Sequence, residues 1–176
     1  ASDVYKRQIL NKRNIILIGM PGAGKSSVGV ILAKVLGYEF IDTDLVIQHR
    51  EKRLLREIIA DEGNEGFLAI ENEVNATLEA NKSVIAPGGS AIYGKEAMEH
   101  FKEIGTIVYL KLSYEDLAKR LGNLKGRGVV LKEGQTLKDL YDERSKLYEQ
   151  YAEITVDESG RDIQGTILAL REQIGM

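Results

Sequence analysis

A glycine-rich run near the start of the chain has the composition of a phosphate-binding loop. Residues Gly19 to Ser26 read GMPGAGKS and match the pattern GxxxxGK[ST] at every fixed position. An apolar run typical of a buried strand (14–19) leads into them, and a stretch with helical apolar spacing (25–36) follows. Glycines let backbone N–H groups turn inward around phosphate oxygens, and a helix N-terminus adds partial positive charge. The pattern predicts that this segment, the phosphate loop, binds the phosphates of ATP.

Individual residues of the phosphate loop have predictable roles. Lys25 can bridge the β- and γ-phosphates, and the Ser26 hydroxyl can ligate Mg²⁺, so ATP and Mg²⁺ are the expected cofactors. A GTPase would also need an Asn-Lys-x-Asp element for guanine, whereas residues 81–84 read NKSV and lack the aspartate. The predicted nucleotide-binding residues of the loop are Gly22, Ala23, Gly24, Lys25, Ser26 and Ser27.

Two aspartates stand at the end of the next predicted strand, at 38–41. Asp42 and Asp44 are two residues apart, so along a strand their side chains would start on the same side of the chain. The carboxyl end of a parallel strand opens into the ligand crevice. Asp42 could hold Mg²⁺, and Asp44 could accept the proton of an attacking hydroxyl. The pair could instead cap a helix, because aspartate favours that position.

Glycines and a loop arginine further along could complete the site. Gly88 and Gly89 follow the predicted strand 84–86, where a bare backbone lets a ligand approach closely or simply makes a turn. Arg127 lies in a segment with three glycines (122–128), which we predict to be a mobile loop. A loop arginine can offset charge on a transferring phosphoryl group, although it could also be an ordinary surface residue.

Two more arginines are candidates for ligand binding. Arg144, on the predicted helix 137–151, could bind an anionic substrate with its planar guanidinium group, or pair with a neighbouring acidic residue on the helix surface. Arg120 could stack on adenine, or act as a cation at a helix end.

Strands and helices are predicted to alternate along the chain, which favours an α/β fold. Because parallel strands need crossover connections, we expect a three-layer sandwich: a five-stranded parallel sheet with helices on both faces. In the helix at 25–36, the predicted inward residues are Val28, Ile31, Leu32 and Val35. The predicted strands are 14–19, 38–41, 84–86, 106–110 and 153–156; the predicted helices are 25–36, 45–80 with a break near Gly63, 95–102, 114–121, 137–151 and 162–174.

Composition limits the classes of function. The chain has 176 residues, of which 43% are hydrophobic and 29% charged, and its net charge is −3. These values suit one globular domain and argue against nucleic acid as a main partner. We find no apolar run long enough for a membrane span, and the absence of cysteine excludes disulfides and thiolate chemistry. We expect a cytoplasmic monomer that acts on a small-molecule substrate. We predict that residues 1–12 are a non-native or disordered extension. Residues 13–176 would form one kinase domain, with a lid at about 122–136.

Together, these landmarks resemble the shikimate kinase family from about Asn14 to Ala169. The phosphate loop, the run FIDTD (40–44), the glycine pair, the lid arginine and the run RSKLY (144–148) occur in the family's order. The resemblance implies a nucleoside-monophosphate-kinase type of fold with a lid. It also implies ATP-dependent phosphorylation of the 3-hydroxyl of shikimate, a step of aromatic amino-acid biosynthesis.

The resemblance also implies roles for the candidate residues. Lys25 and Ser26 would bind ATP–Mg²⁺ and Asp42 would lie near the metal. Asp44 and the Gly88-Gly89 backbone would meet substrate hydroxyls, and Arg144 the substrate carboxylate. Arg120 would lie near adenine. Lys25, Asp44 and the lid residue Arg127 form the expected catalytic set.

The sequence departs from the family pattern at the acceptor side. The family usually has an arginine directly after a phenylalanine, where this chain has Leu68. That arginine is a principal shikimate ligand, and each charged hydrogen bond lost would cost about 1.5–3 kcal/mol. Its absence would leave Glu71 without its expected partner. The family's triple glycine is here Gly88-Gly89-Ser90, and its lid Arg-Pro pair is Arg127-Gly128.

Two accounts of Leu68 are open. Another cation (Arg50, Arg53 or Arg56) could move in and shikimate remain the substrate, or the enzyme could phosphorylate a different small hydroxylated molecule. A third hypothesis, from another class, is a nucleotide-binding regulator that has lost catalysis. The third hypothesis is disfavoured by the retained Lys25, Asp42, Asp44 and Arg127.

Overall fold

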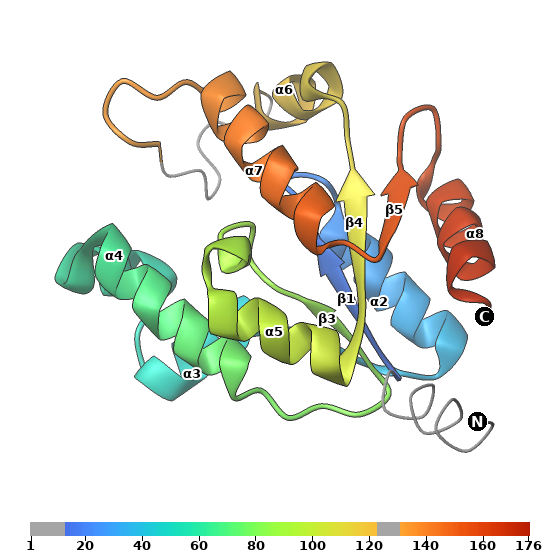
Figure 1. Ribbon diagram of the computed structural model, residues 1–176, viewed down its shortest axis with the longest axis horizontal. Helices are drawn as coiled ribbons and strands as arrows, with labels where there is room; N and C mark the ends of the chain where they lie inside the picture. Colours follow the sequence, from blue (N-terminus) through green and yellow to red (C-terminus); the bar gives the residue numbers. More distant parts are fainter. Residues whose placement is uncertain (1–12, 123–130) are drawn as a thin grey trace.

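The computed structural model describes residues 13–122 and 131–176, which form a five-stranded, fully parallel sheet in the order β2-β3-β1-β4-β5 (Figure 1). The strands are β1 (Asn14–Ile18), β2 (Glu39–Asp42), β3 (Ser83–Ala86), β4 (Gly105–Lys111) and β5 (Ile154–Asp157). The helices are α2 (Lys25–Leu36), α3 (Thr43–Glu51), α4 (Leu55–Ala76), α5 (Lys95–Ile104), α6 (Tyr114–Gly122), α7 (Leu137–Tyr151) and α8 (Ile163–Ile174), with a short 3₁₀ turn η1 (Ala91–Tyr93) after β3.

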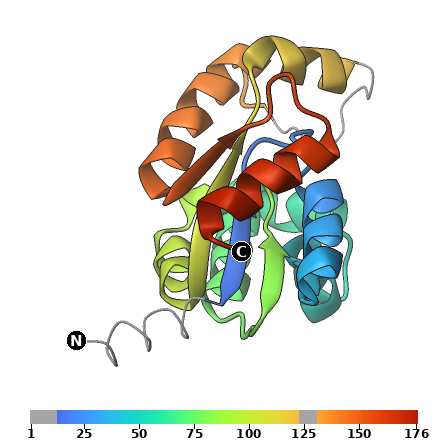
Figure 2. The same ribbon diagram turned by 90° about the vertical axis from the view of Figure 1, so that its right-hand side faces the viewer.

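Alternate residues of β1 face opposite layers of helices. Ile15 and Leu17 belong to a buried cluster that also includes side chains of α2 and α8, while Ile16 and Ile18 belong to one that includes side chains of α5 and α7. Figures 1 and 2 show these helices on the two faces of the sheet. The predicted three-layer α/β fold is confirmed. A third apolar cluster, from α3 and α4, lies beside the sheet.

The inward face of α2 differs from the predicted one. Val28 and Leu32 are buried as expected, but Ile31 is 39% exposed and Val35 is 48% exposed. The buried stripe runs instead through small residues, including Gly29, whose backbone packs closely against the sheet. The prediction weighted large apolar side chains and missed that a close helix–sheet contact selects small ones.

The region predicted as one broken helix contains two helices. Its break near Gly63 is confirmed, because Gly63 has φ 74° and ψ 176° inside α4. An earlier boundary was missed: α3 ends at Lys52, whose φ of 55° is left-handed, and α4 begins after Leu54. The chain also leaves the helical conformation at Thr77, before the predicted end at 80. Apolar periodicity alone does not mark a lysine that adopts a left-handed conformation.

A buried asparagine fixes the start of β1 to its surroundings. The Asn14 side-chain amide donates hydrogen bonds of 2.9 Å to Ala80 O and Ile104 O, and its oxygen accepts one of 2.9 Å from Ser83 N. Three chain segments that are distant in sequence are joined by one side chain that is only 3% exposed.

The loops that carry candidate residues all leave the same edge of the sheet. The phosphate loop follows β1, Asp42 ends β2, Gly88 follows β3 and Glu158 follows β5. Because every strand is parallel, these carboxyl ends converge, as in other open α/β sheets that bind ligands there. Among the described residues, no helix is both long and apolar enough to cross a bilayer.

Some predictions fall outside the described residues. These are the N-terminal extension at 1–12, Arg127 with Gly128, and most of the lid at 122–136. Residues 131–136 precede α7, and the Thr136 hydroxyl caps this helix by accepting a hydrogen bond from Asp139 N.

The packing of α2 on the sheet gives a stability prediction. A Cβ at Gly29 would lie 2.6 Å from Phe40 Cε2 and 3.4 Å from Leu17 Cδ1. We expect Gly29→Ala to lower the free energy of unfolding by roughly 1–2 kcal/mol, because overpacking a filled contact outweighs the better helix propensity of alanine. Thermal or denaturant unfolding measures this. Gly122→Ala, with no heavy atom within 4 Å of the added carbon, is the matched control; equal losses in both variants would contradict the argument.

Candidate active site

The phosphate loop owes its shape to glycines in conformations that other residues avoid. Gly22 and Gly24 have φ of 89° and 83°. A Cβ at Gly19 would lie 2.8 Å from the Leu110 carbonyl oxygen. The Ala23 N–H closes the turn by donating to Met20 O at 3.1 Å. The chain therefore passes from β1 into α2 with a bare, inward-turned backbone.

The N-terminus of α2 presents N–H donors to this loop. Gly24 is the N-cap and has no side chain with which to satisfy them. The N–H groups of the first helical turn, from Lys25, Ser26 and Ser27, lack carbonyl partners within the helix by geometry. Both serine residues are exposed. Such a helix start is suited to bind phosphate oxygens.

The Lys25 ammonium lies between the donor and acceptor sides of the site. Its Nζ donates hydrogen bonds to Gly19 O at 2.7 Å and Met20 O at 2.8 Å. Burial lowers the pKa of Lys25 to about 8, and this effect is partly opposed by the charge of Asp44 and reinforced by that of Arg144. Lys25 therefore lies within electrostatic reach of residues predicted to bind the acceptor.

The two aspartates combine a helix cap with a position at the carboxyl edge of the sheet. Asp42 is the N-cap of α3, where its Oδ1 accepts a hydrogen bond of 2.9 Å from Asp44 N. They also lie at the carboxyl edge of the sheet, close enough to Lys25 to raise its pKa. Burial, then the charge of Asp42, raises the pKa of Asp44 to about 6. The helix cap thus orients the pair without removing it from the site.

The glycine pair after β3 is a point of close approach for protein side chains. A Cβ at Gly88 would lie 3.0 Å from Asp44 Oδ1, and one at Gly89 would lie 2.8 Å from Pro21 Cδ and 2.9 Å from Arg144 Nη1. Neither glycine has a positive φ, so backbone conformation does not require glycine here. Glycine is required because a side chain would not fit. The pair brings the phosphate loop and the acceptor residues together.

Arg144 is buried and points toward this glycine pair. It is 7% exposed, and its guanidinium lies 5.6 Å from the ring centroid of Tyr93. One turn along α7, the Tyr148 hydroxyl donates to Gly89 O at 2.7 Å. The burial of Arg144 excludes the ion pair on the exposed helix surface that the sequence left open. The arginine is held where it can meet a bound anion.

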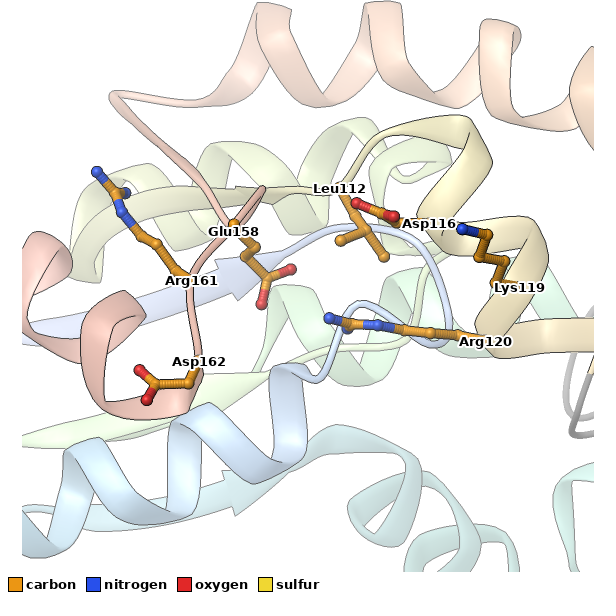
Figure 3. A pocket seen from close by; sticks show the side chains of 8 residues that line it. Leu112, Asp116, Lys119, Arg120, Glu158, Arg161 and Asp162 are labelled. Atoms are coloured by element: carbon orange, nitrogen blue, oxygen red, sulfur yellow. The ribbon is translucent and has the colours of Figure 1, made fainter.

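A pocket of about 450 Å³ lies on the other side of the phosphate loop (Figure 3). Arg120 from α6 and Glu158 from the loop after β5 point toward each other across it. Arg120 Nη1 also donates to Gly22 O at 3.1 Å, which joins the pocket wall to the phosphate loop. The arginine lies in the last turn of α6, so both of its predicted interpretations fit its position.

Glu158 is a site residue that the sequence reasoning missed. It is 6% exposed, and burial raises its pKa to about 7 against the opposing charges of Arg120 and Lys25. The available signal was its position two residues after the predicted strand 153–156. The strands β1, β2 and β3 of the same parallel sheet each have a candidate residue or loop at that edge.

The oxygen donors present fit a magnesium ion. The Ser26 hydroxyl and the Asp42 carboxylate are hard ligands, and Asp42 lies near Lys25. In the described part of the chain there is no group of three or more His, Cys, Asp or Glu side chains that could hold a metal. Mg²⁺ does not need one, because it usually keeps several waters and binds one or two protein oxygens together with substrate phosphates.

Comparison with known proteins identifies the family. The sequence profile of shikimate kinase matches residues 21–174. The chain belongs to the shikimate kinase family. It is 36% identical to a shikimate kinase of Vibrio cholerae serotype O1 over 168 residues, which are 92% of this chain and 97% of that protein. It is 34% identical to shikimate kinase 2 of Yersinia enterocolitica over 154 residues, 82% of this chain and 86% of the other.

Solved structures agree with the family and with the fold. The shikimate kinase of Acinetobacter baumannii in complex with shikimate matches with a TM-score of 0.79 and 32% identity, covering 96% of this chain and 97% of that one. The thymidylate kinase of Candida albicans matches with a TM-score of 0.61 at 16% identity, which shows a shared fold alone.

The position where the resemblance to shikimate kinases led us to expect an arginine lies among apolar side chains. Leu68 packs against the third apolar cluster, which includes Phe67 and Ile47. Of the arginines considered as replacements, Arg50 pairs with Glu73 at 2.7 Å and Arg53 with Asp61 at 3.1 Å; Arg56 is exposed.

Glu71 has a partner that the sequence did not indicate. Its Oε1 accepts a hydrogen bond of 2.7 Å from Ser90 Oγ, at the position where the resemblance led us to expect a third glycine. Glu71 is 2% exposed. Burial raises its pKa to about 7; the hydrogen bond from Ser90 and the charge of Arg144 oppose this, while the charge of Asp44 adds to it.

This raised pKa predicts how stability depends on pH. Between the ordinary carboxyl pKa of 4.5 and about 7, the folded protein holds the Glu71 proton more tightly than the unfolded chain, so Glu71 lowers stability as pH rises through that window. Glutamine does not titrate. We expect Glu71→Gln to melt at or near the wild-type temperature at pH 4.5 and several degrees above it at pH 8. Thermal unfolding across this range measures the difference. A difference that does not change with pH would contradict the raised pKa.

Proposed function

We propose that this protein transfers the γ-phosphoryl group of ATP to the 3-hydroxyl of shikimate. The observation that carries the proposal is the juxtaposition of donor and acceptor groups. Lys25 lies near the end of a complete phosphate loop, and the charges of both Asp44 and Arg144 shift its pKa. A carboxylate and an arginine next to a phosphate-binding loop suit an acceptor with a hydroxyl and an anionic group. Membership of the shikimate kinase family supports the same acceptor.

ATP would lie along the phosphate loop. Backbone N–H groups from Gly22 to Ser27 would bind its phosphates, and the Lys25 ammonium would offset the charge that develops on the transferring group. The adenine would enter the pocket between Arg120 and Glu158. Ser26 and Asp42 would hold Mg²⁺, which when bound neutralises charge on the β- and γ-phosphates. We assign Arg127 to the same phosphates, as the sequence resemblance implies.

Asp44 would act on the acceptor hydroxyl. As the hydroxyl oxygen bonds to the γ-phosphorus, the bond from that phosphorus to the leaving oxygen of ADP breaks, and the hydroxyl proton passes to the Asp44 carboxylate. The guanidinium of Arg144 would hold the acceptor's carboxylate, and the bare backbone at Gly88 and Gly89 would let the ring approach.

One observation favours a second acceptor within the same reaction class. With Leu68 in an apolar cluster, Arg144 is the arginine that lies at the glycine pair among the described residues. A different small hydroxylated molecule, with less anionic charge, is therefore the competing substrate. A regulator without catalysis is disfavoured, because the half-buried Lys25 and Asp44 have pKa values shifted toward neutrality, as is common at catalytic sites.

A coupled ADP-release assay tests the proposal. With Mg²⁺ and ATP, we expect turnover that depends on shikimate and is lost in Lys25→Met, while the variant still melts cooperatively. Hydroxy acids, sugars and nucleosides assayed in parallel test the competing acceptors. An enzyme that binds ATP but shows no shikimate-dependent release of ADP would refute shikimate as the acceptor, and turnover of another compound would identify the alternative.

Arg144 gives a second prediction about the acceptor. Arg144→Lys keeps a charge but loses the planar pair of donors, so we expect the KM for shikimate to rise about 10- to 100-fold, which corresponds to about 1.5–3 kcal/mol for a charged hydrogen bond. The KM for ATP should change little. Steady-state kinetics with each substrate varied separates the two. Lys146→Met, on the exposed side of α7, is the control; a similar rise in that variant would argue against a specific contact.

A further inference from the structure

Glu71 has one carboxylate oxygen satisfied and one that is not. Its Oε1 accepts the hydrogen bond from Ser90 Oγ at 2.7 Å. Its Oε2 is buried and finds no hydrogen-bond partner among the described residues. A buried acceptor without a partner is costly, so its retention calls for an explanation. A purely structural role would account for the bond to Ser90 but not for the second oxygen.

The free oxygen faces the acceptor side of the site. A Cβ at Gly88 would lie 3.1 Å from Glu71 Oε2 and 3.0 Å from Asp44 Oδ1. Two oxygens from different helices, α4 and α3, therefore border the same small space above the Gly88 backbone. One of them belongs to the residue to which we assign the attacking hydroxyl.

No cationic side chain among the described residues hydrogen-bonds this oxygen. Leu68, one turn before Glu71 on α4, packs into the third apolar cluster. Arg50 and Arg53 pair with Glu73 and Asp61. Arg144 is near enough to oppose the rise in the pKa of Glu71. The free oxygen is thus placed to meet a bound molecule.

We propose that Glu71 binds the acceptor directly, through a hydrogen bond between Oε2 and the hydroxyl next to the one that Asp44 engages. The inference rests on the proposed function and adds the acceptor class: a vicinal diol that the Asp44 and Glu71 carboxyl groups bind side by side. A hydroxyl both donates and accepts, so the contact is possible with Glu71 ionised or protonated. Burial raises the pKa of Glu71 to about 7, so both forms are populated near neutral pH.

Ser90 acts in this arrangement as a positioning residue. Its hydroxyl holds Oε1, which fixes the plane of the carboxyl group and leaves Oε2 toward Gly88. Glycine at this position could not do so. Leu68 and Ser90 together therefore turn the glutamate from the partner of an arginine into a ligand for the acceptor.

Ligand and protein changes combined test the contact. In shikimate the hydroxyl adjacent to the 3-hydroxyl is on C4, so the probes are shikimate and its 4-deoxy analogue, with KM and kcat measured for each in the ADP-release assay. We expect the wild-type KM for the analogue to exceed that for shikimate about tenfold or more. In Glu71→Leu, we expect the ratio of the KM for the analogue to the KM for shikimate to be near one, because the carboxyl group that binds the 4-hydroxyl is absent.

The matched control is Glu65→Leu, which removes an exposed carboxylate six residues earlier on α4 and should keep the wild-type ratio. Thermal melting and the KM for ATP check that each variant is folded. A wild-type ratio near one would overturn the inference without any variant. An unchanged ratio in Glu71→Leu, or in Glu71→Ala where the leucine variant does not fold, would overturn it as well. Absence of wild-type turnover with shikimate would instead refute the proposed function.

Discussion

The bare backbone after β3 is the constraint on which the site depends. A methyl group at Gly88 would crowd the side chains of Asp44 and Glu71. A methyl group at Gly89 would crowd Pro21 and the guanidinium group of Arg144. The phosphate loop and three helices can meet only where the chain has no side chains. Donor and acceptor groups are neighbours because the parallel sheet brings its loops to one edge and because two glycines let them close the remaining distance.

Burial at this edge shifts ionisable groups toward neutrality. The pKa of Lys25 falls to about 8, while those of Asp44 and Glu71 rise to about 6 and 7. In each case burial is the largest cause, and neighbouring charges compensate only in part. The folded protein therefore carries unfavourable electrostatics that an ordinary core would avoid. Such local cost is typical of functional sites, where bound substrates supply the missing partners.

Sequence patterns predicted the fold, and for a physical reason. Helical and strand periodicity is local, so β1, α2 and α7 could be located to within a residue or two. What the patterns could not give were contacts across the fold. The burial of Arg144 on Tyr93, and the three hydrogen bonds of Asn14, depend on segments far apart in the chain. Exposure of Ile31 likewise follows from packing of α2 on the sheet.

Leu68 and Ser90, where the resemblance led us to expect an arginine and a glycine, can be understood together. A leucine at position 68 extends the apolar cluster between α3 and α4, but by itself it would leave both oxygens of Glu71 without partners. Ser90 donates a hydrogen bond to one of them, and its side chain is small enough for the tight turn after β3. The pocket then has less positive charge and more oxygen acceptors. Under the proposed contact, Arg144 would recognise the charge of the acceptor, and the carboxyl groups of Asp44 and Glu71 would recognise its hydroxyls.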